Sequence, residues 1–343
     1  MDERTEIGTL GEFGLIDFLT KDIELLHSST IVGVGDDAAV IDNFGKQTVI
    51  STDLLVEGIH FDLSYTPLKH LGYKAIVVNI SDIYAMNAVP KQVLVGIGLS
   101  NRFSIEAISE FYGGIYLACK KFGVDMVGGD TSNSKKGFII SITIIGEVRP
   151  GKFVKRNTAN KGDFICVSGD LGGAYLGLQL LEREKIIYVE NPGVQPDLES
   201  ESYIIKRQLM PEARRDVIEM LDSINVIPTS MIDISDGLSS EILHICKASQ
   251  LGCLVYEDKV PIHNDTRRAA KRFNLDPLTC ALNGGEDYEL LFTINQSDYN
   301  AVFNSGLVSI IGNMTSREER VKMILISGDE VSLSAQGWNT FHK

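Results

Sequence analysis

Hydrophobic positions in the first half of the chain repeat with two different periods. Residues 46–52 (KQTVIST) have the pattern of a strand, whereas residues 66–86 and 104–122 have apolar positions three and four residues apart, as in helices. A short apolar stretch follows at 125–127. Residues 137–148 are rich in β-branched side chains and too short to span a membrane, which predicts a buried strand.

The pattern breaks at residues 149–163, where Pro, Gly and five basic residues interrupt the apolar positions. We therefore place a domain boundary near residue 150, which gives two units, 1–150 and 151–343. A length of 343 residues agrees with about two domains.

The second half also mixes both periods. Strands are predicted at 163–169, 231–235 and 288–294, and a hairpin is predicted at 322–334 around Gly328. A helix is predicted over 173–184, and a second follows from the spacing of Leu238, Ile242, Ile245 and Ser249, with Ser235 or Asp236 near its N-cap. The polar, Pro- and Gly-containing stretch 186–202 is expected to be a surface loop. The fold class is thus α/β (α+β).

The composition describes the environment that we expect for this protein. Acidic residues outnumber basic ones by 46 to 32, a net charge of −14 that disfavours a nucleic-acid partner. The first ten residues are not a basic leader and no apolar run is long enough to cross a bilayer, so we expect a cytoplasmic protein without a membrane partner. The five cysteines stand singly in apolar segments, which predicts buried thiols rather than a metal or redox site.

Two segments resemble phosphate-binding loops but lack their chemistry. Residues 33–38 match G-x-G-x-x-A, yet Asp36 and Asp37 would repel a pyrophosphate at that position. Residues 146–152 have the spacing G-x-x-x-x-G-K, but Phe153 supplies no hydroxyl for Mg²⁺. Neither segment therefore predicts a conventional nucleotide loop.

A better signal is the aspartates that appear where apolar strands give way to Gly- or Ser-rich turns. These are Asp36, Asp37, Asp53, Asp130, Asp233 and Asp236. Each one alone is typical of a turn or a helix cap. Together they predict a cation site, because gathered carboxylates repel one another unless hard cations bind between them. Neighbouring hydroxyls favour Mg²⁺ or Mn²⁺ shared with substrate phosphates.

Asp82 supports the same hypothesis by a different argument. If residues 70–86 are helical, Asp82 lies on one stripe with Ala75, Val78 and Met86, so a carboxylate is in line with the apolar face. The alternative is that Ser81 and Asp82 cap a second helix.

The ordered motifs of this chain resemble those of the thiamine-monophosphate kinase family. They are GEFGLI (11–16), GVGDDAAV (33–40), STDLLVEGIHF (51–61), YKAIVVNISDIYAMNA (73–88), GGDT (128–131), IDISDGL (232–238), GGEDYEL (284–290) and GWNTF (337–341). The resemblance implies a PurM-like two-domain fold. In that fold, the sheet of an N-terminal domain pairs with that of a second subunit in a homodimer, and ATP lies in the cleft before a C-terminal α/β domain.

The resemblance also assigns roles to individual residues. It implies metal binding by Asp37, Ser51, Thr52, Asp53, Asp82, Asp130, Asp233 and Asp236. It implies nucleotide contacts by Tyr112, Gly129, Asp130, Arg156 and Ser235, and thiamine phosphate contacts by His60, Glu286 and either Trp338 or Phe341. Among these, Asp53, Asp130 and Arg156 are expected to serve catalysis.

The implied reaction transfers the γ-phosphoryl group of ATP directly to thiamine monophosphate, giving ADP and thiamine diphosphate. The acceptor is a phosphate monoester with a second pKa of about 6, so it needs no general base at pH 7. Several Mg²⁺ ions, for which Mn²⁺ could substitute, would neutralise the phosphates. Because the thiazolium ring is cationic, we expect its pocket to pair an aromatic face with a carboxylate and to lack Lys and Arg.

Other functions are weighed against this one. A Mg²⁺-dependent phosphohydrolase would use clustered acids to activate water, and a nucleotide-binding module would need fewer ligands. Within the superfamily, a selenophosphate synthetase needs a reactive N-terminal Cys and a hydrogenase-maturation protein a C-terminal Cys, and this chain has neither. Aminoimidazole ribonucleotide synthetase shares the fold but lacks these forms of GGEDYEL and IDISDGL.

Overall fold

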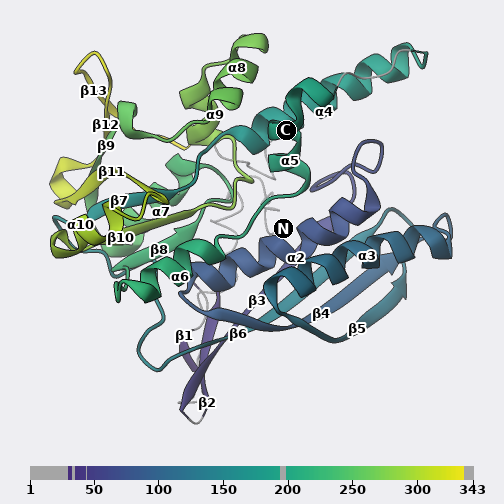
Figure 1. The fold of residues 1–343 in the computed structure, drawn as a ribbon, viewed down its shortest axis with the longest axis horizontal. Helices are drawn as coiled ribbons and strands as arrows, with labels where there is room; N and C mark the ends of the chain where they lie inside the picture. Colours follow the sequence, from purple (N-terminus) through teal and green to yellow (C-terminus); the bar gives the residue numbers. More distant parts are fainter. Residues whose placement is uncertain (1–29, 33–34, 44, 194–197, 336–343) are drawn as a thin grey trace, which may run out of the picture.

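The first half of the chain builds a mixed six-stranded sheet with the order β1-β2-β3-β6-β4-β5 (Figure 1). The structure is a computed structural model that describes residues 30–32, 35–43, 45–193 and 198–335. Neighbouring strands are antiparallel except for β4 and β5, which are parallel. The strands are β1 (Thr30–Val32), β2 (Ala39–Asn43), β3 (Lys46–Val56), β4 (Val89–Leu99), β5 (Asp125–Asn133) and β6 (Ile139–Val148).

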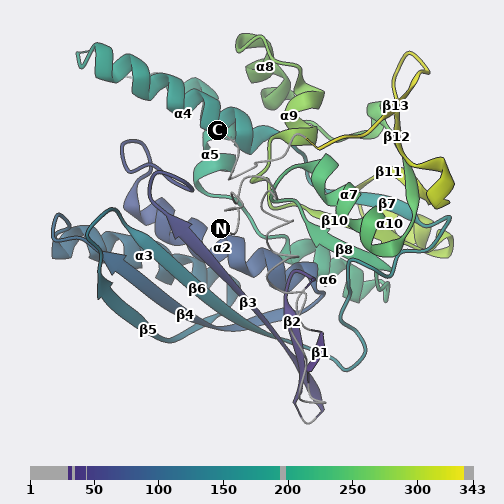
Figure 2. The same cartoon turned by 180° about the vertical axis from the view of Figure 1, so that it is seen from behind.

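Two helices, α2 (Leu68–Ala85) and α3 (Ile105–Phe122), cover one face of this sheet, and Figure 2 shows the other face bare of helices. The period of two in β6 explains the arrangement. Ile140, Ile142 and Ile144 are fully buried under the helices, whereas the residues between them are half-buried on the bare face. Each strand thus has a core side and a more open side.

Helices α2 and α3 pack with their backbones in close approach at two glycines. An added Cβ at Gly114 of α3 would lie 1.9 Å from the carbonyl oxygen of Lys69, and one at Gly72 of α2 would lie 2.0 Å from that of Phe111. Only a residue without a side chain fits at either position. The pair therefore fixes how α2 is placed over the sheet.

The second half builds a seven-stranded sheet with the order β13-β12-β9-β11-β7-β10-β8. Its strands are β7 (Phe164–Ser168), β8 (Ser230–Asp233), β9 (Gly252–Tyr256), β10 (Leu290–Ile294), β11 (Val308–Thr315), β12 (Val321–Ile324) and β13 (Glu330–Ser332). Its helices are α4 (Gly173–Glu190), α5 (Ser202–Leu209), α6 (Arg215–Ser223), α7 (Leu238–Ser249), α8 (Asn264–Arg272), α9 (Pro277–Asn283) and α10 (Tyr299–Phe303). Short 3₁₀ turns are η2 (Glu199–Glu201), η3 (Glu257–Lys259), η4 (Gln296–Asp298) and η5 (Arg317–Glu319).

One apolar cluster runs through both halves. Val217 and Leu221 of α6 and Phe292 of β10 are fully buried in the same cluster as Ile76 and Ile80 of α2. Burial of this kind is the main stabilising contribution to a folded chain. Helix α2 is therefore packed on both sides, by its own sheet and by the second half.

Most predicted elements are confirmed, and one is wrong. The strands and helices of the first half, the hairpin around Gly328 and the buried thiols are all present. The expected loop 186–202 is wrong at both ends, because α4 continues to Glu190 and α5 begins at Ser202. This end of α4 extends away from the rest of the protein (Figure 1), and its apolar side chains Ile186, Tyr188 and Val189 are exposed.

The second phosphate-loop look-alike begins inside a strand. Gly146 lies within β6, where an added Cβ would lie 2.5 Å from Ile83 Cγ2. Among the described residues, no helix is long and apolar enough to cross a membrane.

The close approach of α2 and α3 predicts opposite effects at two neighbouring glycines. Gly114→Ala should lower the free energy of unfolding by about 1–3 kcal/mol, because its methyl group would overlap the α2 backbone. Gly113→Ala is the matched control, since nothing lies within 4 Å of its added Cβ, and it should stabilise α3 by up to about 1 kcal/mol. Urea unfolding measures both, and equal effects would contradict the packing described.

Candidate functional site: an acidic cluster where the two halves meet

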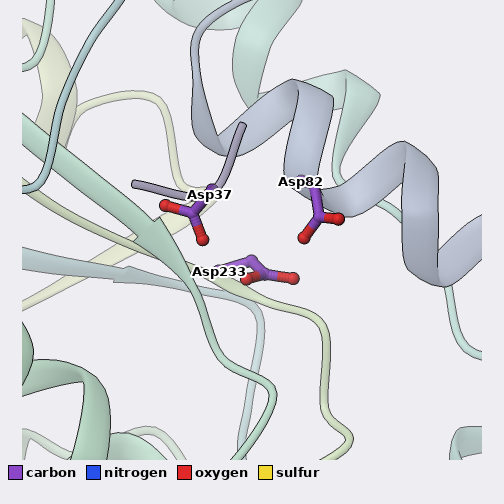
Figure 3. A group of neighbouring side chains, drawn as sticks. All are labelled: Asp37, Asp82 and Asp233. Atoms are coloured by element: carbon purple, nitrogen blue, oxygen red, sulfur yellow. The ribbon is translucent and has the colours of Figure 1, made fainter. Parts of the chain in front are cut away.

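Three aspartates from distant parts of the chain come together between the halves (Figure 3). One carboxylate oxygen of each of Asp37, Asp82 and Asp233 lies within 4.8 Å of the other two. Asp37 comes just before β2, Asp82 lies in the last turns of α2, and Asp233 ends β8. Such a set of oxygen ligands suits a hard divalent cation.

The predicted helical stripe correctly places Asp82. Helix α2 runs unbroken through Ser81, so the alternative of a second helix capped there is wrong. Ser51 donates a hydrogen bond of 2.6 Å from its hydroxyl to Asp82 Oδ2. Burial raises the pKa of Asp82 well above its ordinary value, and the charges of Asp53, Asp233 and Asp37 raise it further.

The pKa values of the other carboxyl groups in this region are raised in the same way. Burial, then the charge of Asp37, raises the pKa of Asp233, which is 4% exposed, to about 7. Burial, then Asp37, also raises the pKa of Asp36 to about 6, and burial raises the pKa of Asp53. Without a bound cation, these carboxyl groups are therefore harder to ionise than free aspartates.

Arg156 supplies positive charge to the cluster. Its Nε donates to Asp37 Oδ2 at 2.8 Å and its Nη2 to Asp37 Oδ1 at 2.5 Å, a two-pronged contact that guanidinium and carboxylate groups favour. Its backbone N–H donates to Asp36 at 3.2 Å. The predicted metal ligand Asp37 and the predicted nucleotide residue Arg156 are thus paired with each other.

Thr52, Gly129 and Asp130 are not brought to the cluster. Thr52 Oγ1 donates to the Ile142 carbonyl at 2.9 Å and lies 3.0 Å from Thr143 Oγ1, on the bare face of the first sheet. Asp130 is exposed on that same face. Residues paired across neighbouring strands share a face of the sheet, and register links Asp130 through Gly96 and Ser141 to Leu54, which lies on the bare face. Strand alternation is the physical reason, since Ser51 and Asp53 face the helices and Thr52 must face away.

Gly129 is explained by packing in β5. Its added Cβ would lie 1.9 Å from the Val95 carbonyl oxygen, so the edge strand approaches β4 closely there. Tyr112 lies on α3 and lines a separate groove of about 500 Å³ with Leu99, Phe103 and Ile108. The residues of the acidic cluster do not line this groove.

Glu286 lies in a tight turn beside the cluster. It has a left-handed backbone (φ 57°), and its N–H donates to the Ser235 carbonyl at 2.6 Å. Its carboxylate contacts Lys74 Nζ at 3.1 Å and accepts a hydrogen bond from Gln208 Nε2 at 2.7 Å. Glu286, a predicted residue of the thiamine pocket, is thus paired with a lysine, whereas the pocket itself is expected to lack Lys and Arg.

The next two acids of this turn have structural partners. Asp287 Oδ2 accepts from the backbone N–H of Gly172 at 2.6 Å, and burial raises the Asp287 pKa to about 6. Arg207 lies 3.3 Å from Asp287 and 2.9 Å from Glu289. These contacts hold the turn in place and leave Glu286 as the acid that faces α2.

The remaining predicted residues make local contacts or lie outside the described chain. His60 is exposed after β3, and its Nδ1 accepts the Val56 N–H at 3.0 Å. The Asp236 N–H donates to Glu241 Oε1 at 3.0 Å. The N-cap of α7 is Gly237, so Ser235 and Asp236 lie near the N-cap, as predicted. Trp338 and Phe341 lie outside the described residues.

Sequence reasoning missed Lys74, Gln208 and Glu241. Lys74 could have been found, because it lies eight residues before Asp82 and shares its helical stripe with Val78. Glu241 is buried within α7, and its position near Asp236 depends on the turn between β8 and α7.

The comparisons with known proteins agree with this geometry. Residues 35–148 match the family model of AIR synthase related protein, N-terminal domain. The chain is 35% identical to a thiamine-monophosphate kinase of Aquifex aeolicus over 332 residues, covering 97% of this chain and 98% of that protein. The chain belongs to the thiamine-monophosphate kinase family.

Two further relatives of this family extend the match. A thiamine-monophosphate kinase of Bacillus subtilis is 32% identical over 340 residues, which cover 97% of this chain and all of that protein. A solved structure of AaThiL complexed with AMPPCP and TMP superimposes with a TM-score of 0.82 at 32% identity, covering 98% of each chain. The predicted PurM-like α/β fold class is confirmed.

The raised carboxyl pKa values predict how stability depends on pH without metal. An unfolded aspartate loses its proton near pH 4, whereas folded Asp233 keeps it until about pH 7, so stability falls as pH rises through this window. Asp233→Asn removes this linkage. It should melt several degrees above the parent protein at pH 8 in EDTA and show a flatter pH profile.

Differential scanning calorimetry from pH 5 to 8 measures this difference. Asp42→Asn, at an exposed position of β2, is the matched control and should follow the parent profile. A parent protein whose stability rises over the same window would contradict the raised pKa values.

Proposed function

We propose that this chain transfers the γ-phosphoryl group of ATP to thiamine monophosphate, giving ADP and thiamine diphosphate. The proposal rests on the cluster of Asp37, Asp82 and Asp233 in a chain that matches thiamine-monophosphate kinases over nearly its full length. The related structure with AMPPCP and TMP supports the two substrates.

Mg²⁺ or Mn²⁺ fits the donor set of this cluster. The three carboxylates offer oxygen ligands only and lie close together. The pKa values of Asp82 and Asp233 are raised, so a dication would relieve the repulsion. Asp37, Asp82 and Asp233 would hold it, with Asp53 and Ser51 beside them. Bound there, the ion would neutralise phosphate oxygens as charge moves during transfer.

The chain's own residues then position the reactants. The acceptor phosphate is largely dianionic at pH 7 and attacks without a protein base. Arg156 can leave Asp37 when a cation takes its place, which frees the guanidinium to stabilise the transferring group. Ser235 is exposed next to the turn of Glu286.

Several family assignments stay predictions under this proposal. Tyr112, Gly129 and Asp130 would contact ATP or metal, and His60, Glu286 and Trp338 or Phe341 would contact the thiamine phosphate. The domain limits 1–150 and 151–343 and the cytoplasmic location are also predictions.

A homodimer accounts for the bare face of the first sheet. That face exposes apolar side chains, with Leu54 56% and Leu94 37% exposed. Exposed apolar side chains on a helix-free sheet are the kind of surface that a partner covers. A second copy on this face would enclose Thr52 and approach Asp130.

The first test is the reaction itself. With MgATP and thiamine monophosphate, the protein should form ADP and thiamine diphosphate in equal amounts, and Asp233→Asn should lower kcat/KM by about 10²–10³-fold because an electrostatic stabiliser of the site is lost. Chromatography of both products measures this, with Asp42→Asn as control. Free phosphate without thiamine diphosphate would favour a phosphohydrolase instead.

The second test concerns the dimer. Leu54→Asp should shift the protein from dimer to monomer in sedimentation equilibrium, because a charge would be buried in the shared face. Ile105→Asp, at an exposed position of α3, is the control and should leave the dimer intact. If the parent protein is a monomer, or if both variants remain dimers, the proposed interface is wrong.

A further inference from the structure

Lys74 is a buried ammonium group at the junction of the two halves. It lies on α2 and is 5% exposed. Its Nζ is 3.1 Å from Glu286 Oε1 and donates to the Gln208 carbonyl at 3.0 Å. A buried lysine is costly unless it is paired and hydrogen-bonded, and here both partners come from the second half of the chain.

The same contacts fix the carboxylate of Glu286. Lys74 holds one oxygen, and Gln208 Nε2 donates to the other at 2.7 Å. The turn beneath is held by the hydrogen bond from the Glu286 N–H to Ser235, and Gly285 and Glu286 both have left-handed backbones. A carboxylate with a partner on each oxygen has one orientation.

Helix α2 links this contact to the acidic cluster. Lys74, Val78 and Asp82 follow one another at four-residue steps, so they share one stripe, and Lys74 and Asp82 are separated by about 12 Å along the axis. One rigid helix therefore presents an ammonium group to Glu286 and a carboxylate to Asp37 and Asp233. This spacing fits an elongated acceptor whose phosphate and heterocyclic ends lie apart.

We propose that Lys74 is a positioning residue for thiamine monophosphate: it orients Glu286 toward the heterocyclic end of the acceptor and fixes its distance from the acidic cluster. This inference rests on the proposed function. Lys74 acts through Glu286 and takes no part in phosphoryl transfer.

The experiment is a double-mutant cycle with calorimetric titration of each substrate. Lys74→Met and Glu286→Ala should each weaken thiamine monophosphate binding by about tenfold, the scale of one lost charged hydrogen bond, and leave binding of an ATP analogue within about twofold. The double variant should bind no more weakly than Glu286→Ala. Lys74→Arg should recover part of the loss, and Lys69→Met, at an exposed position of α2, should match the parent protein.

Gln208→Leu is a second test of the inference, and it leaves the buried charges of Lys74 and Glu286 in place. It removes the other contact of Glu286 and should also weaken thiamine monophosphate binding selectively. If Lys74→Met does not fold, this variant decides the matter.

Additive losses in the cycle, or equal losses for both substrates with a lowered melting temperature, would show that Lys74 only joins the two halves. Normal binding of thiamine monophosphate by Glu286→Ala would also overturn the inference, although the kinase function would stand. Failure of the parent protein to form thiamine diphosphate would instead refute the proposed function.

Discussion

Repulsion among buried carboxylates is the constraint on which the arrangement of this protein depends. The carboxylates of Asp37, Asp82 and Asp233 approach within 4.8 Å of one another, and Asp233 is buried while the other two are half-buried. In such surroundings, like charges either take up protons or require a cation. The fold keeps them together because Asp82 lies in α2, Asp233 ends β8 and Asp37 comes just before β2, and Arg156 offsets part of their charge. The site is thus prepared for the charge of a metal and phosphates.

Helix α2 connects the acidic cluster to the rest of the molecule through its packing. It is packed on α3 through glycine contacts, on its own sheet through apolar side chains, and on α6 through the cluster that both halves share. Asp82 and Lys74 project from the same stripe to two different parts of the second half. A shift of this helix would therefore disturb the phosphate and thiamine ends together.

Local periodicity predicted much of this structure, because it depends on neighbouring residues. The stripe of Asp82 followed from helical spacing, and the strands followed from alternation. Period two also implies that Thr52 faces away from Ser51 and Asp53, a consequence that the family resemblance obscured. The exposed face of Asp130 depends on the register of β5 with β4 and β6, and the pairing of Lys74 with Glu286 depends on how the halves pack. Neither follows from local pattern.

The central claim is that the three aspartates form a metal site, and that the Arg156 guanidinium pairs with Asp37 until a cation binds there. Anomalous diffraction from a crystal grown with Mn²⁺ and a non-hydrolysable ATP analogue tests it most directly. The account predicts an anomalous peak about 2.1–2.2 Å from carboxylate oxygens of Asp37, Asp82 and Asp233, with Arg156 turned away from Asp37. Manganese bound elsewhere, with the contact between Arg156 and Asp37 intact, would contradict it.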